Sequence, residues 1–129
     1  MPSSYGSMTS ITINLDGLVG GAIAASTVVD NSSTMFDAVQ VYLKLTPGSL
    51  RDGAFVLVGL MASSDNVTFA DSSATEVKIS NLQTKVANVH FLTLNNLPPF
   101  FKIYVHNRTG NPFSSNPGDN SLSYCPVKI

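Results

Sequence analysis

The residue types that carry most enzyme and metal chemistry are few in this chain and show no recognised spacing. His90 and His106 are its two histidines, and Cys125 is its single cysteine. No His-x-His pair, HExxH sequence or Cys/His cluster accompanies them, so the sequence supports neither a zinc site nor a Cys/His nucleophile. We expect each histidine to lie on a strand and make an ordinary hydrogen bond.

The carboxylates are scattered along the chain, and most of them stand among Ser, Asn and Gly, where capping a turn is their usual role. Any two could meet in space as the pair that glycoside hydrolysis requires, but their spacing selects no pair. The sequence SSDNVTF (residues 63–69) could place Asp65 and Asn66 near a calcium ion, although a plain β-turn explains it better. The eight acids are Asp16, Asp30, Asp37, Asp52, Asp65, Asp71, Glu76 and Asp119.

Other catalytic and modification motifs are equally weak. There is no GxSxG sequence for a serine nucleophile, and Gly20 and Gly21 do not lead into the Gly-Lys-Ser/Thr of a phosphate-binding loop. Glycosylation sequons begin at Asn31, Asn66 and Asn107, but without a secretory signal we interpret them as chance matches. The sequence therefore predicts a protein that is not an enzyme and has no catalytic residue, metal or cofactor.

Composition excludes further classes. The 129 residues are 43% hydrophobic but only 12% charged, with a net charge of −1 and no basic cluster, which argues against nucleic-acid binding. The most apolar stretch, Ala54 to Ala62, is shorter than the roughly 20 residues of a membrane helix. The first residues, MPSSYGSMTS, lack the basic and apolar regions of a signal peptide. One cysteine permits no internal disulfide.

Positioning of any functional residue must come from strands, because apolar residues recur with a period of two and no helical stripe is evident. We predict an all-β fold, an antiparallel β-sandwich or jelly roll, formed by residues 9–129 as a single domain. A flexible arm, residues 1–8, precedes it. The nine expected strands cover residues 10–15, 20–29, 36–45, 54–62, 67–69, 76–79, 86–94, 100–106 and 121–127.

Alternation also assigns faces, and one strand has an unusual outer face. In the stretch FFKIYVH, Phe101, Ile103 and Val105 form an apolar inner row, yet the opposite row also carries aromatic residues. An outer row of this kind must be covered by a loop, another subunit or a partner. Tyr5 and Phe113 are the bulky apolar groups of the arm and of the loop 108–120. The candidate partner-interface residues are therefore Tyr5, Tyr42, Phe100, Tyr104, His106 and Phe113.

The same strand lies within the sequence LPPFFKIYVHNRTG (residues 97–110). Pro98 and Pro99 fix their own φ and extend the residues before them, so the strand enters in one register. The residues from Asn107 to Gly110 suit the exit turn. A slip of one residue would exchange the inner and outer rows. Maintenance of the fold alone is therefore one explanation of this motif, and an interface is the other.

Together, SSDNVTF, LPPFFKIYVHNRTG and a closing strand resemble small virion proteins of tailed bacteriophages. In that family the two motifs read like SxDGxxF and LPPyfKvvvkNxTG, and the match covers residues 36–127, with Asn66 replacing the usual turn glycine. The resemblance implies a homo-oligomeric virion structural protein, first of all a capsid decoration (cement) protein bound to the major capsid protein or other virion proteins. The alternative is a tail- or fibre-associated adsorption module that binds host glycan through loop aromatics such as Phe113. A glycan hydrolase is the third reading.

Overall fold

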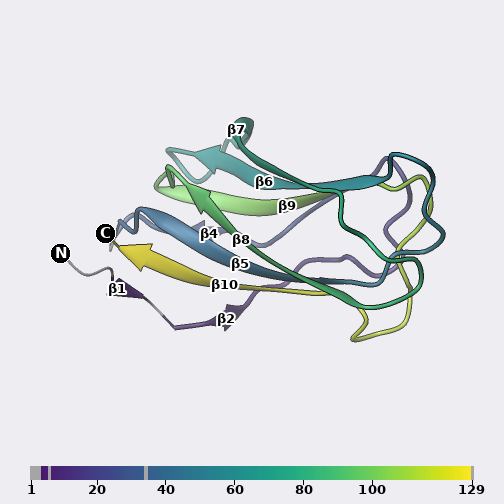
Figure 1. Ribbon diagram of the computed structural model, residues 1–129. Coiled ribbons are helices and arrows are strands. Elements are labelled where there is room, and N and C mark those ends of the chain that lie inside the picture. Colours follow the sequence, from purple (N-terminus) through teal and green to yellow (C-terminus); the bar gives the residue numbers. More distant parts are fainter. Residues whose placement is uncertain (1–3, 6, 34, 129) are drawn as a thin grey trace.

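The computed structural model describes residues 4–5, 7–33 and 35–128, with backbone only for residues 4–5 and 71–75. Two antiparallel sheets pack face to face, which confirms the predicted all-β sandwich (Figure 1). The described residues form strands and no helix. The strands are β1 (Ser4–Tyr5), β2 (Thr9–Ser10), β3 (Ile23–Ala25), β4 (Val29–Asp30), β5 (Ala38–Leu45), β6 (Phe55–Ser63), β7 (Ala70–Ile79), β8 (Asn88–Asn95), β9 (Phe100–Arg108) and β10 (Ser121–Lys128).

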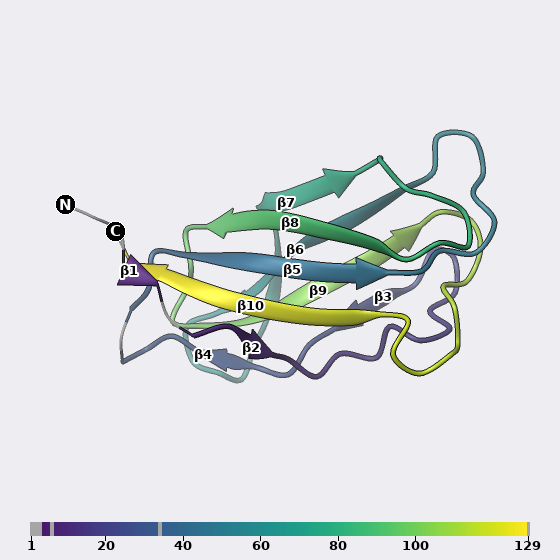
Figure 2. The ribbon, with the colours of Figure 1, turned by 60° about the horizontal axis from the view of Figure 1, so that its bottom comes forward.

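Each sheet has two long central strands. Sheet A has the order β1-β10-β5-β8, and β2 also pairs with β10. Sheet B has the order β3-β9-β6-β7, and β4 also pairs with β9. Figure 2 shows β8, β5 and β10 side by side in sheet A, with the strands of sheet B behind them. Strands adjacent in the chain therefore often lie in different sheets, as in a jelly roll.

The core lies between the sheets and follows the predicted alternation. On β5, Val39, Val41, Leu43 and Leu45 are all fully buried. They face Phe101, Ile103 and Val105 of β9 and the inward residues of β6 across the sandwich. β6 is apolar on both faces, as suits a strand that lies between β9 and β7.

Some expected strands are interrupted. Residues 11–15 form no ladder, although the Ile11 amide bonds the Leu122 carbonyl and Leu15 is buried in the core. The expected strand 20–29 divides into β3 and β4 at Ser26, whose hydroxyl accepts the hydrogen bond of the Ile103 amide at 2.9 Å. A side chain thus takes the place of a backbone acceptor. The expected strand 67–69 is not formed, whereas the expected strand 76–79 is the C-terminal part of the longer β7, which begins at Ala70.

The arm expected over residues 1–8 falls partly outside the described residues. Within the described part, Ser4 and Tyr5 pair with Lys128 and Val127 of β10. Its mobility in the free protein stays a prediction.

Phe101 is the largest side chain that is fully buried. We expect Phe101→Ala to lower the free energy of unfolding by about 3–5 kcal/mol, since burial is lost and a cavity remains. The matched control is Phe91→Ala, which truncates a half-exposed ring and should cost under about 1 kcal/mol. Urea unfolding followed by fluorescence measures both. Equal losses for the two variants would contradict this assignment of inner and outer faces.

Candidate partner interface

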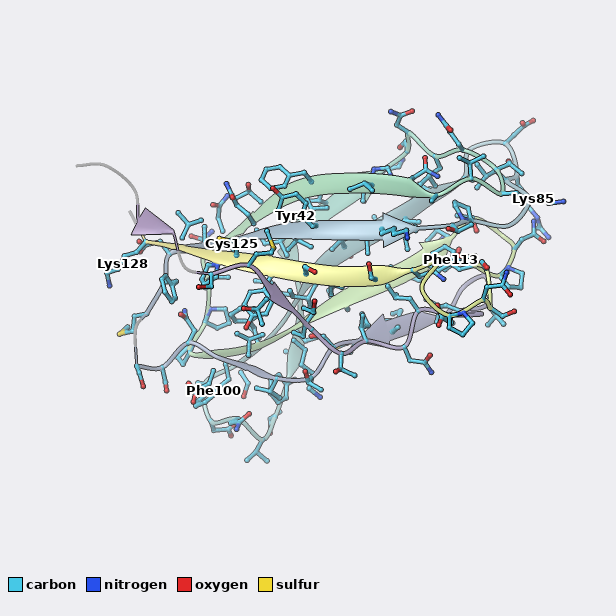
Figure 3. The ribbon with its side chains drawn as sticks, turned by 90° about the horizontal axis from the view of Figure 1, so that it is seen from below. Tyr42, Lys85, Phe100, Phe113, Cys125 and Lys128 are labelled. Atoms are coloured by element: carbon cyan, nitrogen blue, oxygen red, sulfur yellow. The ribbon has the colours of Figure 1, made fainter. Side chains whose placement is uncertain are left out.

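The six candidate interface residues do not form one surface. Tyr42 lies on the outer face of sheet A, whereas Phe100 and His106 are half-buried on the outer face of sheet B. Figure 3 labels Tyr42 and Phe100 on their separate strands. Tyr42 and Phe100 therefore cannot belong to one continuous patch, because the two outer faces point in opposite directions. The side chain of Tyr5 lies outside the described residues.

Phe113 is not a surface aromatic. Its side chain is 2% exposed and belongs to the core, where it closes one end of the sandwich. Its backbone amide bonds the Leu18 carbonyl at 3.1 Å, which ties the loop to the segment after Leu15. The expected exposure of Phe113 is wrong because the only apolar side chain of a long polar loop gains most by burial.

Tyr104 is also buried, at 4% exposure, although it belongs to the outer row of β9. It lies directly opposite Gly59 of β6, and its ring occupies the space above that glycine. A Cβ at Gly59 would lie 2.8 Å from the ring carbons. The Tyr104 hydroxyl donates a hydrogen bond to the Glu76 carboxylate of β7. The protein's own sheet therefore covers Tyr104, and its expected role in a partner contact is wrong.

Cations lie over two further aromatic rings beside sheet B, those of Phe55 and Phe69. Lys78 Nζ lies 4.5 Å from the centroid of the Phe55 ring, and the Arg108 guanidinium lies 5.4 Å from the same centroid. Lys102 Nζ lies 4.7 Å from the centre of the Phe69 ring. Cation–π contacts of this kind leave the charge in water and shield the ring. The outer row of β9 itself is not fully exposed, since Tyr104 is buried and Phe100 and His106 are half-buried.

A cluster of exposed apolar side chains lies on the outer face of sheet A. Tyr42 and Phe91 are opposite each other on β5 and β8, with ring centroids 4.5 Å apart and planes tilted by 58°. Their exposures are 40% and 52%, and the neighbouring Val89 is 68% exposed. We call Tyr42, Val89 and Phe91 the aromatic patch. Gln40, Lys44 and Thr93 surround it.

Sequence analysis found Tyr42 but missed Phe91 and Val89. The signal was present in the stretch NVHFLTLN, because Leu92 and Leu94 face inward and alternation then places Phe91 outside. The pairing of β8 with β5 was not readable from the sequence, and it is this pairing that joins Phe91 to Tyr42.

A cavity of about 450 Å³ lies beside the two prolines of the LPP motif. Asn31 shapes it: its side chain accepts the Phe36 amide at 2.7 Å and donates to the Phe36 carbonyl at 3.0 Å. The Asn31 amide bonds the Pro99 carbonyl at 2.7 Å. Asp37 is the only acid in its lining, which comprises Asn31, Ser32, Met35, Phe36, Asp37, Asn96, Leu97, Pro98 and Pro99. Among the described residues, no three His, Cys, Asp or Glu side chains gather as a metal site.

The exit turn of the motif is organised by Asn107, which is fully buried. Its Nδ2 donates to the carbonyls of Leu18 and Asn111, both at 2.8 Å. Its Oδ1 accepts the amide and the hydroxyl of Thr109 at 2.9 and 2.6 Å. Gly110 follows with a φ of 89°, a conformation that favours glycine. These contacts support fold maintenance as the role of the NRTG sequence.

The SSDNVTF segment is a capped turn. Asp65 accepts the amides of Val67 and Thr68 at 2.8 and 3.0 Å, and Asn66 takes the left-handed conformation with φ of 62°. The hydrogen bonds from Thr68, Val67 and the Ser63 hydroxyl lower the pKa of the Asp65 carboxyl. The β-turn interpretation is confirmed, and Asn66 adopts a backbone conformation that more often requires glycine.

His90 faces inward on β8, on the same side as Leu92 and Leu94. Its Nε2 is buried and has no hydrogen-bond partner among the described residues, so the expected ordinary hydrogen bond is not made there. Burial lowers the pKa of the His90 imidazole below its ordinary value of 6.5, because desolvation disfavours the charged ring.

The chain resembles no protein closely enough to assign a family. No protein-family model and no curated protein matches it. A similar solved structure is the exo-β-1,3-galactanase of Phanerochaete chrysosporium with β-1,3-galactotriose, at 14% identity and a TM-score of 0.46 over 97% of this chain. The same enzyme with galactose gives 13% identity and a TM-score of 0.40 over 98% of this chain. The chain spans 28% and 29% of those two chains. Similarity at this level carries no argument about activity.

Within the described part of the chain, no helix has the length and apolar character to cross a membrane.

We expect Asn107→Ala to lower the free energy of unfolding by at least about 3 kcal/mol, because buried partners lose their hydrogen bonds at about 1–3 kcal/mol each. Asn107→Asp retains the acceptor but loses both donors, and should be as unstable. Asn88→Ala is the control, since water replaces its exposed hydrogen bonds to the carbonyls of Gln83 and Val86. Urea denaturation compares the three variants. A small effect of Asn107→Ala would show that the loop does not depend on it.

The lowered pKa of His90 predicts acid sensitivity. The folded state binds this proton more weakly than the unfolded state does, so stability is highest above the unfolded pKa and falls as the pH drops below it towards the folded pKa. Unfolding free energies measured from about pH 7.5 down to about pH 5.5, above the range of most carboxylates, should therefore decrease. The His90→Leu variant should show a flatter profile over this window. Identical slopes for the two proteins would contradict the assignment.

Proposed function

We propose that this chain is a non-enzymatic structural protein of a bacteriophage virion, and that it decorates the capsid by docking on the major capsid protein lattice. The observation that carries the proposal is the aromatic patch, a cluster of exposed apolar side chains built around two rings in contact, on a weakly charged molecule. The resemblance of the SSDNVTF and LPPFFKIYVHNRTG motifs to virion proteins supplies the class of partner.

The patch has the make-up of an interface core. Tyrosine and phenylalanine are enriched at the centres of protein contacts, where polar residues form the rim. Tyr42 and Phe91 are the centre here, and Gln40, Lys44 and Thr93 are the rim. Lys44 is held to one side, because its Nζ donates to the Gly118 carbonyl at 3.0 Å.

The patch is also rigid before it binds. All eight residues of β5 pair with β8 in one continuous register, and β5 is flanked on its other side by β10. Ordering a flexible surface weakens binding, so a patch built on a ladder that holds Tyr42 and Phe91 opposite each other retains more of its contact energy. A protein that acts by attachment to a lattice benefits from this arrangement.

The adsorption alternative has less support. It assigned glycan stacking to exposed loop aromatics such as Phe113, and Phe113 is buried. The hypothesis of a glycan hydrolase requires two carboxylates close enough to act as a catalytic pair. The cavity beside the LPP motif offers only Asp37 for that role. Copy number separates decoration from adsorption, since decoration requires hundreds of copies on each particle and adsorption a few tens at most.

The double variant Tyr42→Ser, Phe91→Ser should lose attachment while it keeps its fold. Truncating a hot-spot aromatic costs about 2 kcal/mol or more, which is roughly thirty-fold in Kd for each site. Purified, labelled protein is added to phage particles that lack it, and the bound copies are counted across a titration. Circular dichroism confirms that the variant is folded.

The matched control is Val19→Ser, Val67→Ser, which removes two exposed apolar side chains outside the aromatic patch. It should bind as the unchanged protein does. Full attachment of the double aromatic variant, or equal loss in both double variants, would contradict docking through the patch.

A further inference from the structure

A β-sandwich has sheet edges where backbone N–H and C=O groups face outward and can pair with another chain. In this fold sheet A has β8 at one edge and the short strands β1 and β2 at the other. Sheet B has β7 at one edge and the short strands β3 and β4 at the other. Proteins normally block such edges with short strands, charges or bulges. The four edges of this fold differ in how many of these devices they carry.

Three edges are blocked. β1 and β2 have two residues each, and β3 and β4 have three and two, so none offers a long ladder. β7 is longer, but it carries Glu76 and Lys78, and its register with β6 shifts between Val58 and Leu60. Charges and a register irregularity both oppose the addition of a strand.

The β8 edge has none of these devices. Its eight residues, NVHFLTLN, include no acid, lysine, arginine or proline. All eight pair with β5 without a register shift. Among the described residues no strand pairs with the other side of β8. β7 comes close to it but forms no ladder with it (Figure 2). Val89 and Phe91 add exposed apolar side chains along the same edge.

We propose that β8 pairs with β8 of a second copy of this chain, antiparallel and about a two-fold axis at Phe91. Residues directly opposite each other in an antiparallel pair share a face, so a register centred on Phe91 keeps the outer rows together. Phe91 then faces Phe91 of the second copy, and Val89 faces Thr93. Sheet A becomes continuous across the two copies.

The chemistry of the edge favours a second copy over a foreign strand. The pairing is self-complementary, as a two-fold contact requires. It also joins the two aromatic patches into one row in the order Tyr42, Phe91, Phe91, Tyr42. Lys44 lies opposite Val89 on the neighbouring strand β5. Three strand spacings and a four-residue offset place the two Lys44 side chains roughly 20 Å apart. That distance exceeds the Debye length of about 10 Å, so they do not repel strongly.

This inference does not rest on the proposed function. It concerns the edge of sheet A rather than its face, and it is tested on the free protein without phage particles. A monomeric protein that still attaches to capsids would overturn the pairing alone. A dimer that fails to attach would overturn the decoration role alone.

Cross-linking tests the register. In a Cys125→Ala background, which removes the native thiol, Phe91→Cys places two thiols opposite each other, with Cβ atoms about 5 Å apart. Mild oxidation should yield a disulfide-linked dimer. Tyr42→Cys is the matched control, on the same face and similarly exposed. Its two copies would be roughly 14 Å apart across three strand spacings, too far for a disulfide.

Sedimentation velocity over a concentration series provides a second measurement without cysteine. The contact lies at the low end of interface sizes, below about 1,200 Å², so we expect a reversible dimer with a Kd on the order of micromolar. Val89→Lys adds a charge to the edge and should raise this Kd by about tenfold or more. Val86→Lys makes the same change in the loop before β8 and should leave the Kd unchanged.

The outcomes are decisive. A disulfide at position 91 but not at position 42, with a dimer sensitive only to Val89→Lys, supports the proposal. A monomer at every concentration overturns it, including the case in which β8 accepts only a strand of another protein. Cross-links at both positions, or equal effects of the two lysine variants, show a different contact and overturn it as well.

Discussion

The alternation of side chains along β5 and β9 is the constraint on which the other features depend. Once Val41 and Leu43 are buried against the opposite sheet, Tyr42 between them must point to solvent. The same rule on β9 buries Phe101 and Ile103 and turns Lys102 outward. Because neighbouring strands are in register, the inward and outward positions of β5 and β9 also determine those of β8, β6 and β10. The position of the aromatic patch is therefore a consequence of how the core is filled.

Two buried asparagines hold the ends of this arrangement. Asn31 joins the loop after β4 to the proline turn before β9, and Asn107 joins the end of β9 to the segments around Leu18 and Asn111. An amide suits both places because it donates and accepts at once, so one side chain satisfies backbone groups from two loops. β9 is thus fixed at its entry and at its exit. Both asparagines begin glycosylation sequons, and their burial supports the interpretation of these as chance matches.

The sequence predicted the long strands well and the short ones poorly. Strands with clear alternation, such as β5 and β9, were placed within two residues of their bounds. Residues 11–15 and 20–29 have the same local pattern, but the chain there is held by tertiary contacts such as that between Ser26 and Ile103, which no local pattern encodes. Among the candidate interface residues, alternation assigned the outer rows correctly. It could not tell that Tyr104 is covered by its own sheet, because that depends on which strand supplies Gly59.

The contact between Tyr104 and Gly59 has an evolutionary consequence. Any side chain at position 59 would enter the volume of the Tyr104 ring, and a smaller residue at position 104 would expose the Gly59 backbone to water. Neither position can change alone without loss of packing. If a larger residue at position 59 is accompanied by a smaller one at position 104, the packing is preserved. The two sites are therefore inherited as one unit, and Glu76, which accepts the Tyr104 hydroxyl, extends that unit to a third strand. In a lineage of such proteins, drift on this face should proceed by paired replacements.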